Sequence, residues 1–185
     1  MRLFIASGFS APVVARIREL QDFARARLGE RVKWVEPENI HLTYAFLGEV
    51  AEQKLLPAIQ SGMDAAAGAF QRTPVALGGL GAFPSLERPR VLWLGVREGE
   101  GLLKALSLKL YASLAEKGFI FEREFSAHIT LARVKGRLDA ASVASAAAKA
   151  GELDVRDTIV SLDLMESRLS SSGPEYHVVY SIKLL

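Results

Sequence analysis

The order of predicted secondary structure repeats along this chain of 185 residues, and the repeat restricts the fold more than any other feature. Hydrophobic periodicity, interrupted by glycine and proline, gives the same order twice: a strand, a helix, a strand that begins His-x-Thr, a second helix and two strands expected to form a hairpin. The predicted strands span 2–9, 41–48, 74–82, 90–96, 126–134, 154–166 and 175–184, and the predicted helices span 11–28, 52–70, 101–117 and 138–150. Two similar lobes related by a pseudo-twofold axis would bring the two His-x-Thr strands to equivalent positions beside one cleft.

Each His-x-Thr motif places a histidine and a threonine on one face of its strand. The first motif holds His41 and Thr43, and the second holds His128 and Thr130. Side chains alternate between the two faces of a strand, so residues two positions apart point the same way. The apolar residue between them then points to the opposite face, toward a core covered by helices.

Two imidazoles and two hydroxyls on one surface can bind and cleave a phosphodiester, because the hydroxyls donate hydrogen bonds to phosphate oxygens and the imidazoles move protons near neutral pH. Either motif alone is more simply explained by chance, with threonine present for its β-propensity and histidine as a satisfied interior residue. However, the chain has three histidines, and two of them occupy matching positions in the repeat. That coincidence favours a functional role for the two motifs over chance. The third, His177, lies on the last predicted strand without a threonine two residues later and is interpreted as structural.

Composition narrows the class of protein. The 23 Lys and Arg against 21 Asp and Glu give a formal net charge of +2, which is not a strong nucleic-acid signature. The chain has no cysteine, which excludes disulfides, zinc-thiolate sites and a thiol nucleophile and suits a reducing compartment. No stretch approaches the roughly 18 apolar residues of a membrane-spanning helix. We therefore expect a cytoplasmic monomer without membrane contact.

Several stretches resemble the two-histidine phosphoesterases, and within them the bacterial and archaeal RNA 2',3'-cyclic phosphodiesterases, also known as 2'-5' RNA ligases. The matching segments are RLFIA at 2–6, ENIHLTYAFLGE at 38–49, RVLWLGV at 90–96, FSAHITLAR at 125–133 and the closing SRLSSSGPEYHVVYSI. The resemblance implies one two-lobed α+β domain over residues 1–185, with two antiparallel-rich sheets flanking a central cleft and helices on the outside. It also implies an enzyme that uses no metal and no cofactor.

The family pattern implies a role for each motif residue. His41 would be the proton donor, His128 the proton acceptor, and Thr43 and Thr130 the phosphate ligands. The substrates would be RNA ends or nucleotides that carry a 2',3'-cyclic phosphate, which water opens to a 2'-phosphate, and the reverse reaction would give 2'-5' RNA ligation.

Five further residues are predicted substrate contacts of lesser weight: Arg133, Arg90, Phe46, Trp34 and Tyr176. Arg133 is out of alternation with Thr130, so a role in the cleft requires a bend of the strand or a position on the rim. The chain also departs from the family at two positions. Ala127 stands where proline often precedes the second histidine. Ala45 stands where a basic residue is common, which removes any phosphate contact from that position.

Two other classes of function remain open from the sequence. The first is a nucleotide- or RNA-binding module of the same fold without catalysis, although pure binding does not require two proton carriers. The second is a histidine-ligated metallohydrolase, although the chain lacks H-x-x-x-H and H-x-H spacings, so any metal would need distant carboxylates.

Overall fold

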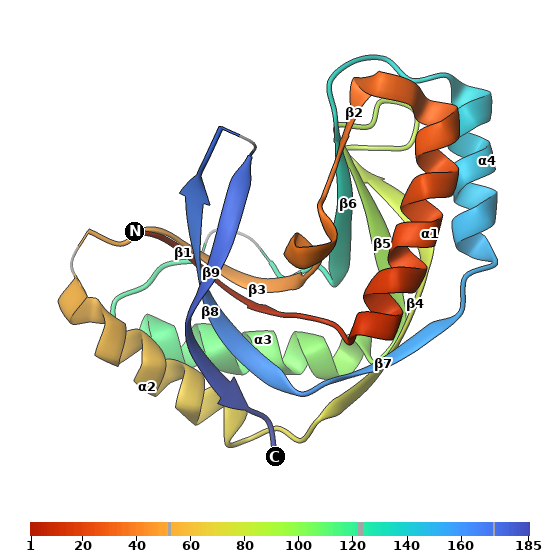
Figure 1. The fold of residues 1–185 in the computed structure, drawn as a ribbon. Helices are drawn as coiled ribbons and strands as arrows, with labels where there is room; N and C mark the ends of the chain where they lie inside the picture. Colours follow the sequence, from red (N-terminus) through yellow and green to blue (C-terminus); the bar gives the residue numbers. More distant parts are fainter. Residues whose placement is uncertain (52, 122–123, 172) are drawn as a thin grey trace.

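A computed structural model describes residues 1–51, 53–121, 124–171 and 173–185 (Figure 1). The first residue of the predicted 52–70 helix lies outside this part of the chain. The strands are β1 (Arg2–Ser7), β2 (Val32–Trp34), β3 (Leu42–Glu49), β4 (Thr73–Phe83), β5 (Val91–Glu98), β6 (His128–Val134), β7 (Val155–Ile159), β8 (Ser161–Leu169) and β9 (Pro174–Lys183). The helices are α1 (Ala11–Leu28), α2 (Leu56–Ala67), α3 (Glu100–Ala115) and α4 (Ala140–Gly151), with short 3-10 turns at Gly29–Arg31, Pro37–Asn39 and Gln53–Leu55.

The predicted α+β class with an antiparallel sheet is confirmed, with one difference: the two sheets are continuous. The strands follow the order β7-β4-β5-β6-β3-β1-β8-β9, and β2 also pairs with β6. Strands β3 and β6 pair at Leu42 and Ile129, and on either side of this point they diverge into two lobes. We call β3-β1-β8-β9 the first sheet and β7-β4-β5-β6 with β2 the second.

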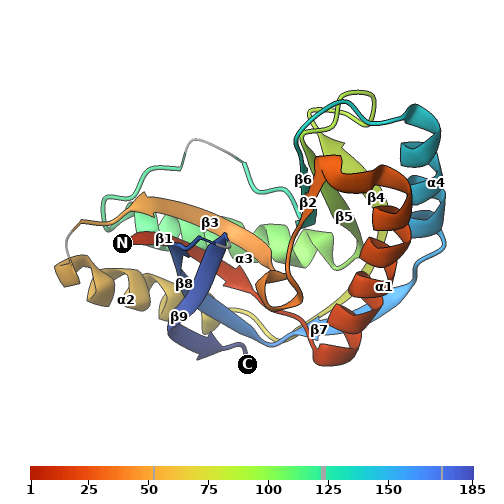
Figure 2. The same cartoon turned by 45° about the horizontal axis from the view of Figure 1, so that its top comes forward.

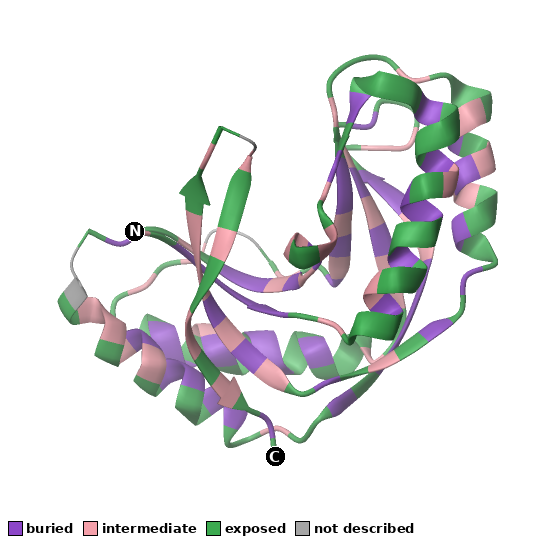
Figure 3. Ribbon diagram, viewed as in Figure 1, coloured by how far each residue is buried: buried purple, intermediate pink, exposed green. Residues whose placement is uncertain are grey.

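Helices cover one face of each sheet. Helices α2 and α3 pack together under the first sheet, and α1 and α4 pack together behind the second (Figures 1 and 2). The opposite face, which the helices leave uncovered, is called the open face below. Buried residues run along the strands of both sheets and along the helices that cover them, as the colours of Figure 3 show.

The lobes do not correspond to the two halves of the sequence. Helix α1 follows β1 of the first sheet but packs in the second lobe, whereas α3 follows β5 of the second sheet but packs in the first lobe. The predicted strand over 154–166 is in fact two strands. Its first part, β7, pairs with β4, and its second part, β8, pairs with β1, because the chain crosses from one lobe to the other at Val160.

The helix over 11–28 has the predicted bounds, and its expected apolar face, which includes Val13, Ile17 and Leu20, is buried. Apolar positions recur every three or four residues, so one stripe of the helix can face the sheet. Pro12 occupies the first turn, where its missing N–H costs no hydrogen bond. One buried residue of this helix is polar: Gln21.

Strands β3 and β6 each contain a β-bulge just after the His-x-Thr motif. In β3, Ala45 pairs with Ile5 and Thr43 with Ala6, so Tyr44 is the extra residue. In β6 the pairing with β5 skips Leu131 in the same way. A bulge leaves the extra residue unpaired and shifts the alternation of side chains by one position.

Helix side chains donate hydrogen bonds to the carbonyl groups of the two bulged residues. The Tyr111 hydroxyl of α3 donates to the Tyr44 carbonyl oxygen at 2.8 Å. The Gln21 side-chain amide of α1 donates to the Leu131 carbonyl oxygen at 3.0 Å and to the Val35 carbonyl oxygen at 2.9 Å. The Leu131 carbonyl oxygen also accepts from the Val35 N–H at 2.9 Å, so Gln21 adds a second hydrogen bond there and supplies the donor for Val35. An unpaired buried carbonyl costs about 1–3 kcal/mol, so these helix residues stabilise the backbone at both bulges.

No helix in the described ranges is long and apolar enough to cross a membrane.

Candidate active site

The two His-x-Thr motifs meet where the sheets join. Leu42 and Ile129, the middle residues of the motifs, are direct partners in the antiparallel pair, and both are fully buried. Their neighbours therefore flank one point of the open face, with His41 on the side of Thr130 and Thr43 on the side of His128. All four side chains are half-buried.

Both histidines are held in the same tautomer by a backbone carbonyl two residues earlier. The Nδ1–H of His41 donates to the Asn39 carbonyl oxygen at 2.7 Å, and the Nδ1–H of His128 donates to the Ser126 carbonyl oxygen at 2.8 Å. A carbonyl oxygen can only accept, so Nδ1 carries the proton and Nε2 is the nitrogen left for proton transfer.

Aromatic rings surround each imidazole. The His41 ring lies 5.1 Å from the Phe4 ring and 5.3 Å from the Tyr176 ring, measured between centroids. The His128 ring lies 5.1 Å from the Phe83 ring and 6.1 Å from the Trp93 ring. These contacts hold both rings in place and keep water from one side of each imidazole.

Burial lowers the pKa of both histidines below the usual value for this side chain. For His41 the loss of hydration is the largest cause, the Asn39 carbonyl opposes it, and the charge on His128 lowers the pKa further. For His128 the loss of hydration is again the largest cause, and the Ser126 carbonyl opposes it. Because the charge of one ring acts on the other, the two histidines titrate as a coupled pair.

The bulges turn two further side chains to the open face. Without the extra Leu131, Arg133 would face the core; with it, Arg133 is exposed on the same face as Thr130. Phe46 occupies the matching position of β3 and is 72% exposed. Ala45 pairs with Ile5 and is buried, so a side chain at that position faces the core.

Tyr176 lies beside the first histidine. Its ring contacts His41, and the charges of Arg133 and Arg2 act on its hydroxyl. Burial nevertheless raises the pKa of Tyr176, with both arginines opposing that shift. Tyr176 therefore packs against the His41 imidazole within the electrostatic influence of two guanidinium groups.

Two predicted contacts are not brought to the histidine pair. Trp34 lies in the hydrophobic core with 9% exposure, and it pairs with the buried Ala132. Arg90 is exposed on a pocket between residues 87–90 and 134–138. An aromatic side chain such as Trp34 can stack on any base, but the short strand β2 turns this one inward. Strand β2 has no distinct signal in the sequence.

Sequence reasoning missed Phe4 and Trp93 as neighbours of the histidines. Trp93 lies flat over Gly81, where a Cβ atom would come within 2.1 Å of the indole ring. A glycine opposite a tryptophan in a predicted hairpin is the signal that could have found this packing. Phe4 shares the first strand with buried Leu3 and Ile5, so alternation alone assigns it to the open face.

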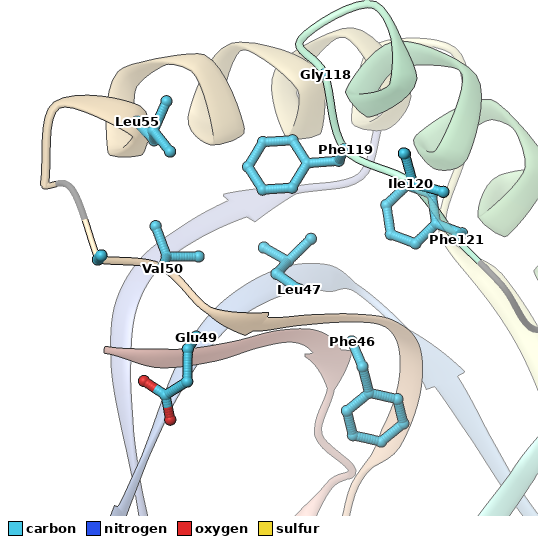
Figure 4. Close-up of a pocket in the computed structure, with 10 residues that line it drawn as sticks. Phe46, Leu47, Glu49, Val50, Leu55, Gly118, Phe119, Ile120 and Phe121 are labelled. Atoms are coloured by element: carbon cyan, nitrogen blue, oxygen red, sulfur yellow. The ribbon is translucent and has the colours of Figure 1, made fainter.

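A mostly apolar pocket of about 430 Å³ lies on the other side of β3 from the open face (Figure 4). Figure 4 shows Leu47 and Val50 pointing toward Phe119, while Phe46 points away from them across the strand. Phe46 thus marks the border between this pocket and the open face.

Among the residues that the structure describes, no three His, Asp or Glu side chains gather into a group that could hold a metal ion.

Comparison with known proteins identifies the class to which this site belongs. The sequence pattern of the family described as "LigT like Phosphoesterase" matches the chain twice in succession, over residues 8–93 and 94–176. The chain is therefore a two-histidine phosphoesterase, and it belongs to the LigT-like phosphoesterase family. The double match also agrees with the repeat in the sequence.

Similar proteins carry a more specific name. An RNA 2',3'-cyclic phosphodiesterase of Aeropyrum pernix is 38% identical over 92% of this chain and 96% of its own length. One of Archaeoglobus fulgidus is 36% identical over 95% of this chain and 96% of its own length.

Solved structures agree in fold. A crystal structure of a Thermus thermophilus protein superposes with a TM-score of 0.82 at 28% identity, and it covers 100% of this chain and 98% of that one. Escherichia coli LigT complexed with 3'-AMP superposes with a TM-score of 0.72 at 25% identity, over 99% of this chain and 97% of that one.

Proposed function

We propose that this protein is an RNA 2',3'-cyclic phosphodiesterase that opens the cyclic phosphate to a 2'-phosphate. The observation that carries the proposal is the pair of His-x-Thr motifs, held at one point by the Leu42 and Ile129 pair. The names of the similar proteins support the reaction class. The substrates are RNA ends or nucleotides with a 2',3'-cyclic phosphate, and we expect a cytoplasmic monomer.

The proposed mechanism uses the two Nε2 atoms on opposite sides of the phosphorus. His128 removes a proton from water while the water oxygen bonds to phosphorus. The bond from phosphorus to the 3' oxygen breaks, and His41 gives that oxygen its proton. Thr43 and Thr130 donate hydrogen bonds to the two non-bridging oxygens, where negative charge is concentrated. If a 5'-hydroxyl replaces water, the same displacement forms a 2'-5' linkage.

The tautomer of the histidines favours catalysis over the alternative of a non-catalytic binding module. Each Nδ1–H is used by a backbone carbonyl, so each Nε2 of a neutral ring presents a lone pair. A module that only bound phosphate would need donors, whereas a lone pair repels an anionic oxygen. A nitrogen that can accept a proton, beside two threonine hydroxyls that can bind the phosphate, suits proton transfer.

The direct test is incubation with a 2',3'-cyclic nucleotide and with an RNA that ends in a 2',3'-cyclic phosphate, both in excess EDTA. We expect a 2'-phosphate from both substrates and an unchanged rate after chelation, because threonine hydroxyls and a protonated imidazole meet the phosphate charge. Products are separated by chromatography that resolves 2'- from 3'-phosphates. Loss of activity in EDTA with recovery in zinc or manganese would indicate the metallohydrolase instead.

The pH dependence follows from the lowered pKa values of the histidines. Catalysis requires a protonated His41 and a neutral His128, so kcat/KM should be bell-shaped. Because burial lowers the pKa of both groups in the free enzyme, the optimum of kcat/KM should lie below about pH 6.5. A bound phosphate anion raises the pKa of both imidazoles, so the optimum of kcat should lie at higher pH. A kcat/KM plateau that continues above about pH 8 contradicts this scheme.

A further inference from the structure

A basic pocket of about 500 Å³ lies beside the start of β5 and the end of β6, between residues 87–90 and 134–138. These loops are at the top of the second lobe in Figure 1. Four basic side chains and one acidic side chain line it: Arg88, Arg90, Lys135, Arg137 and Glu87. The whole chain has a net charge of only +2, so this pocket concentrates positive charge in one place.

The positive charge of the pocket is offset only in part, by the one carboxylate of Glu87. Within the described residues, none of the four basic side chains forms an ion pair, and all four are exposed. A fifth basic residue fixes the loop: the Arg31 side chain donates to the Arg137 carbonyl oxygen at 2.9 Å, and the Arg31 carbonyl oxygen accepts from the Lys135 N–H at 2.7 Å. The pocket is thus held in shape by backbone contacts that leave its charges available to a ligand.

Strand β6 connects the pocket to the histidine pair. His128 begins the strand and Val134, which lines the pocket, ends it, so the two are about 20 Å apart at roughly 3.3 Å per residue. Arg133 is exposed on the open face between them. On the other side of the site, the Phe46 pocket is mostly apolar and includes Glu49. Positive charge therefore extends from the histidines toward the second lobe.

We propose that this pocket binds phosphates of the RNA strand on the 5' side of the cyclic end, so that the preferred substrate is an oligonucleotide. The inference rests on the function proposed above and adds a second binding site to it. Cationic side chains bind a phosphodiester backbone without regard to base sequence. A mononucleotide held at the histidines is too short to reach the pocket, whereas a strand of several nucleotides can contact both sites.

The test compares two triple variants that remove the same charge. Arg88→Gln/Lys135→Gln/Arg137→Gln neutralises the pocket, and Arg18→Gln/Lys104→Gln/Lys109→Gln removes three exposed charges from α1 and α3 as the control. Turnover is measured on a 2',3'-cyclic mononucleotide and on an RNA of about ten nucleotides with a cyclic end. Binding of an RNA of that length ending in a 2'-phosphate is measured by fluorescence anisotropy as a function of salt.

We expect the pocket variant to raise KM and Kd for the long RNA about tenfold, and to lower the slope of log Kd against log salt by about 2. Turnover of the mononucleotide should stay within about twofold, and the control variant should resemble the wild type. Equal weakening by both variants, or an unchanged Kd in the pocket variant, overturns the proposal. If the wild type turns over neither substrate, the proposed function fails, and the anisotropy measurement still decides whether the pocket binds RNA.

Discussion

Replacing His41 or His128 by alanine is expected to lower kcat/KM on a 2',3'-cyclic nucleotide by roughly a hundredfold or more, as the loss of a positioned acid or base does. The double variant should be little slower than the worse single variant, because both groups act in one transition state. Both rings are half-buried at the edge of the core, so Tm should fall by about 2–4 °C at most. Turnover near the wild-type value in either variant removes that histidine from the mechanism.

A substrate with sulfur in place of the departing 3' oxygen separates the two roles. Sulfur leaves without a proton. The rate deficit of His41→Ala relative to the wild type should therefore be at least about tenfold smaller on this analogue than on the oxygen substrate. His128→Ala should remain slow, because its water is still not activated. The reverse pattern exchanges the roles, and equal recovery supports neither assignment.

Replacing Gln21 by leucine is expected to destabilise the protein by about 1–3 kcal/mol and to raise KM. The leucine cannot donate to the Val35 and Leu131 carbonyl oxygens, so the Val35 carbonyl loses its donor and the bulge in β6 keeps only the hydrogen bond from the Val35 N–H. If the strand relaxes to regular pairing, Arg133 turns toward the core. Urea unfolding measures the first effect, and steady-state kinetics measure the second.

Two further variants show whether Gln21 acts through Arg133. Tyr111→Phe removes the equivalent donor from the bulge in β3, so it should perturb Phe46 and leave Arg133 in place. Combining Gln21→Leu with Arg133→Ala should raise KM no more than Arg133→Ala alone. Additive effects on KM would show that Gln21 contributes to stability only.

The sequence predicted most elements of this fold because its long segments have a clear hydrophobic period. The 11–28 helix and the His-x-Thr strands were found in this way, and the buried Leu42 and Ile129 follow from simple alternation. The exchange of helices between lobes was not predicted, since periodicity shows which face of a helix is buried but not which sheet covers it.

The surroundings of the site were less predictable than the motifs. The bulges have no glycine or proline to mark them, so the position of Arg133 could not be decided from its spacing. Trp34 and Phe46 are both aromatic residues near a motif, yet one is buried in the core and the other is 72% exposed. The difference arises from strand pairing, which depends on residues far away in the chain.

The crossing of α1 and α3 between the lobes has a consequence for how such a site could arise. Each half of the chain provides one His-x-Thr strand, but the helix whose side chain stabilises the bulge in that strand belongs to the other half. A peptide with a single repeat would contain one histidine, one threonine and one half of the Leu42 and Ile129 contact. Two copies could exchange their first helices across a symmetric dimer interface at that contact. Such a dimer would contain two histidines, two threonines and the whole contact. The family match in two successive segments fits a gene duplication that fused such a dimer into one chain and then allowed the two copies to diverge, with phenylalanine after one motif and arginine after the other.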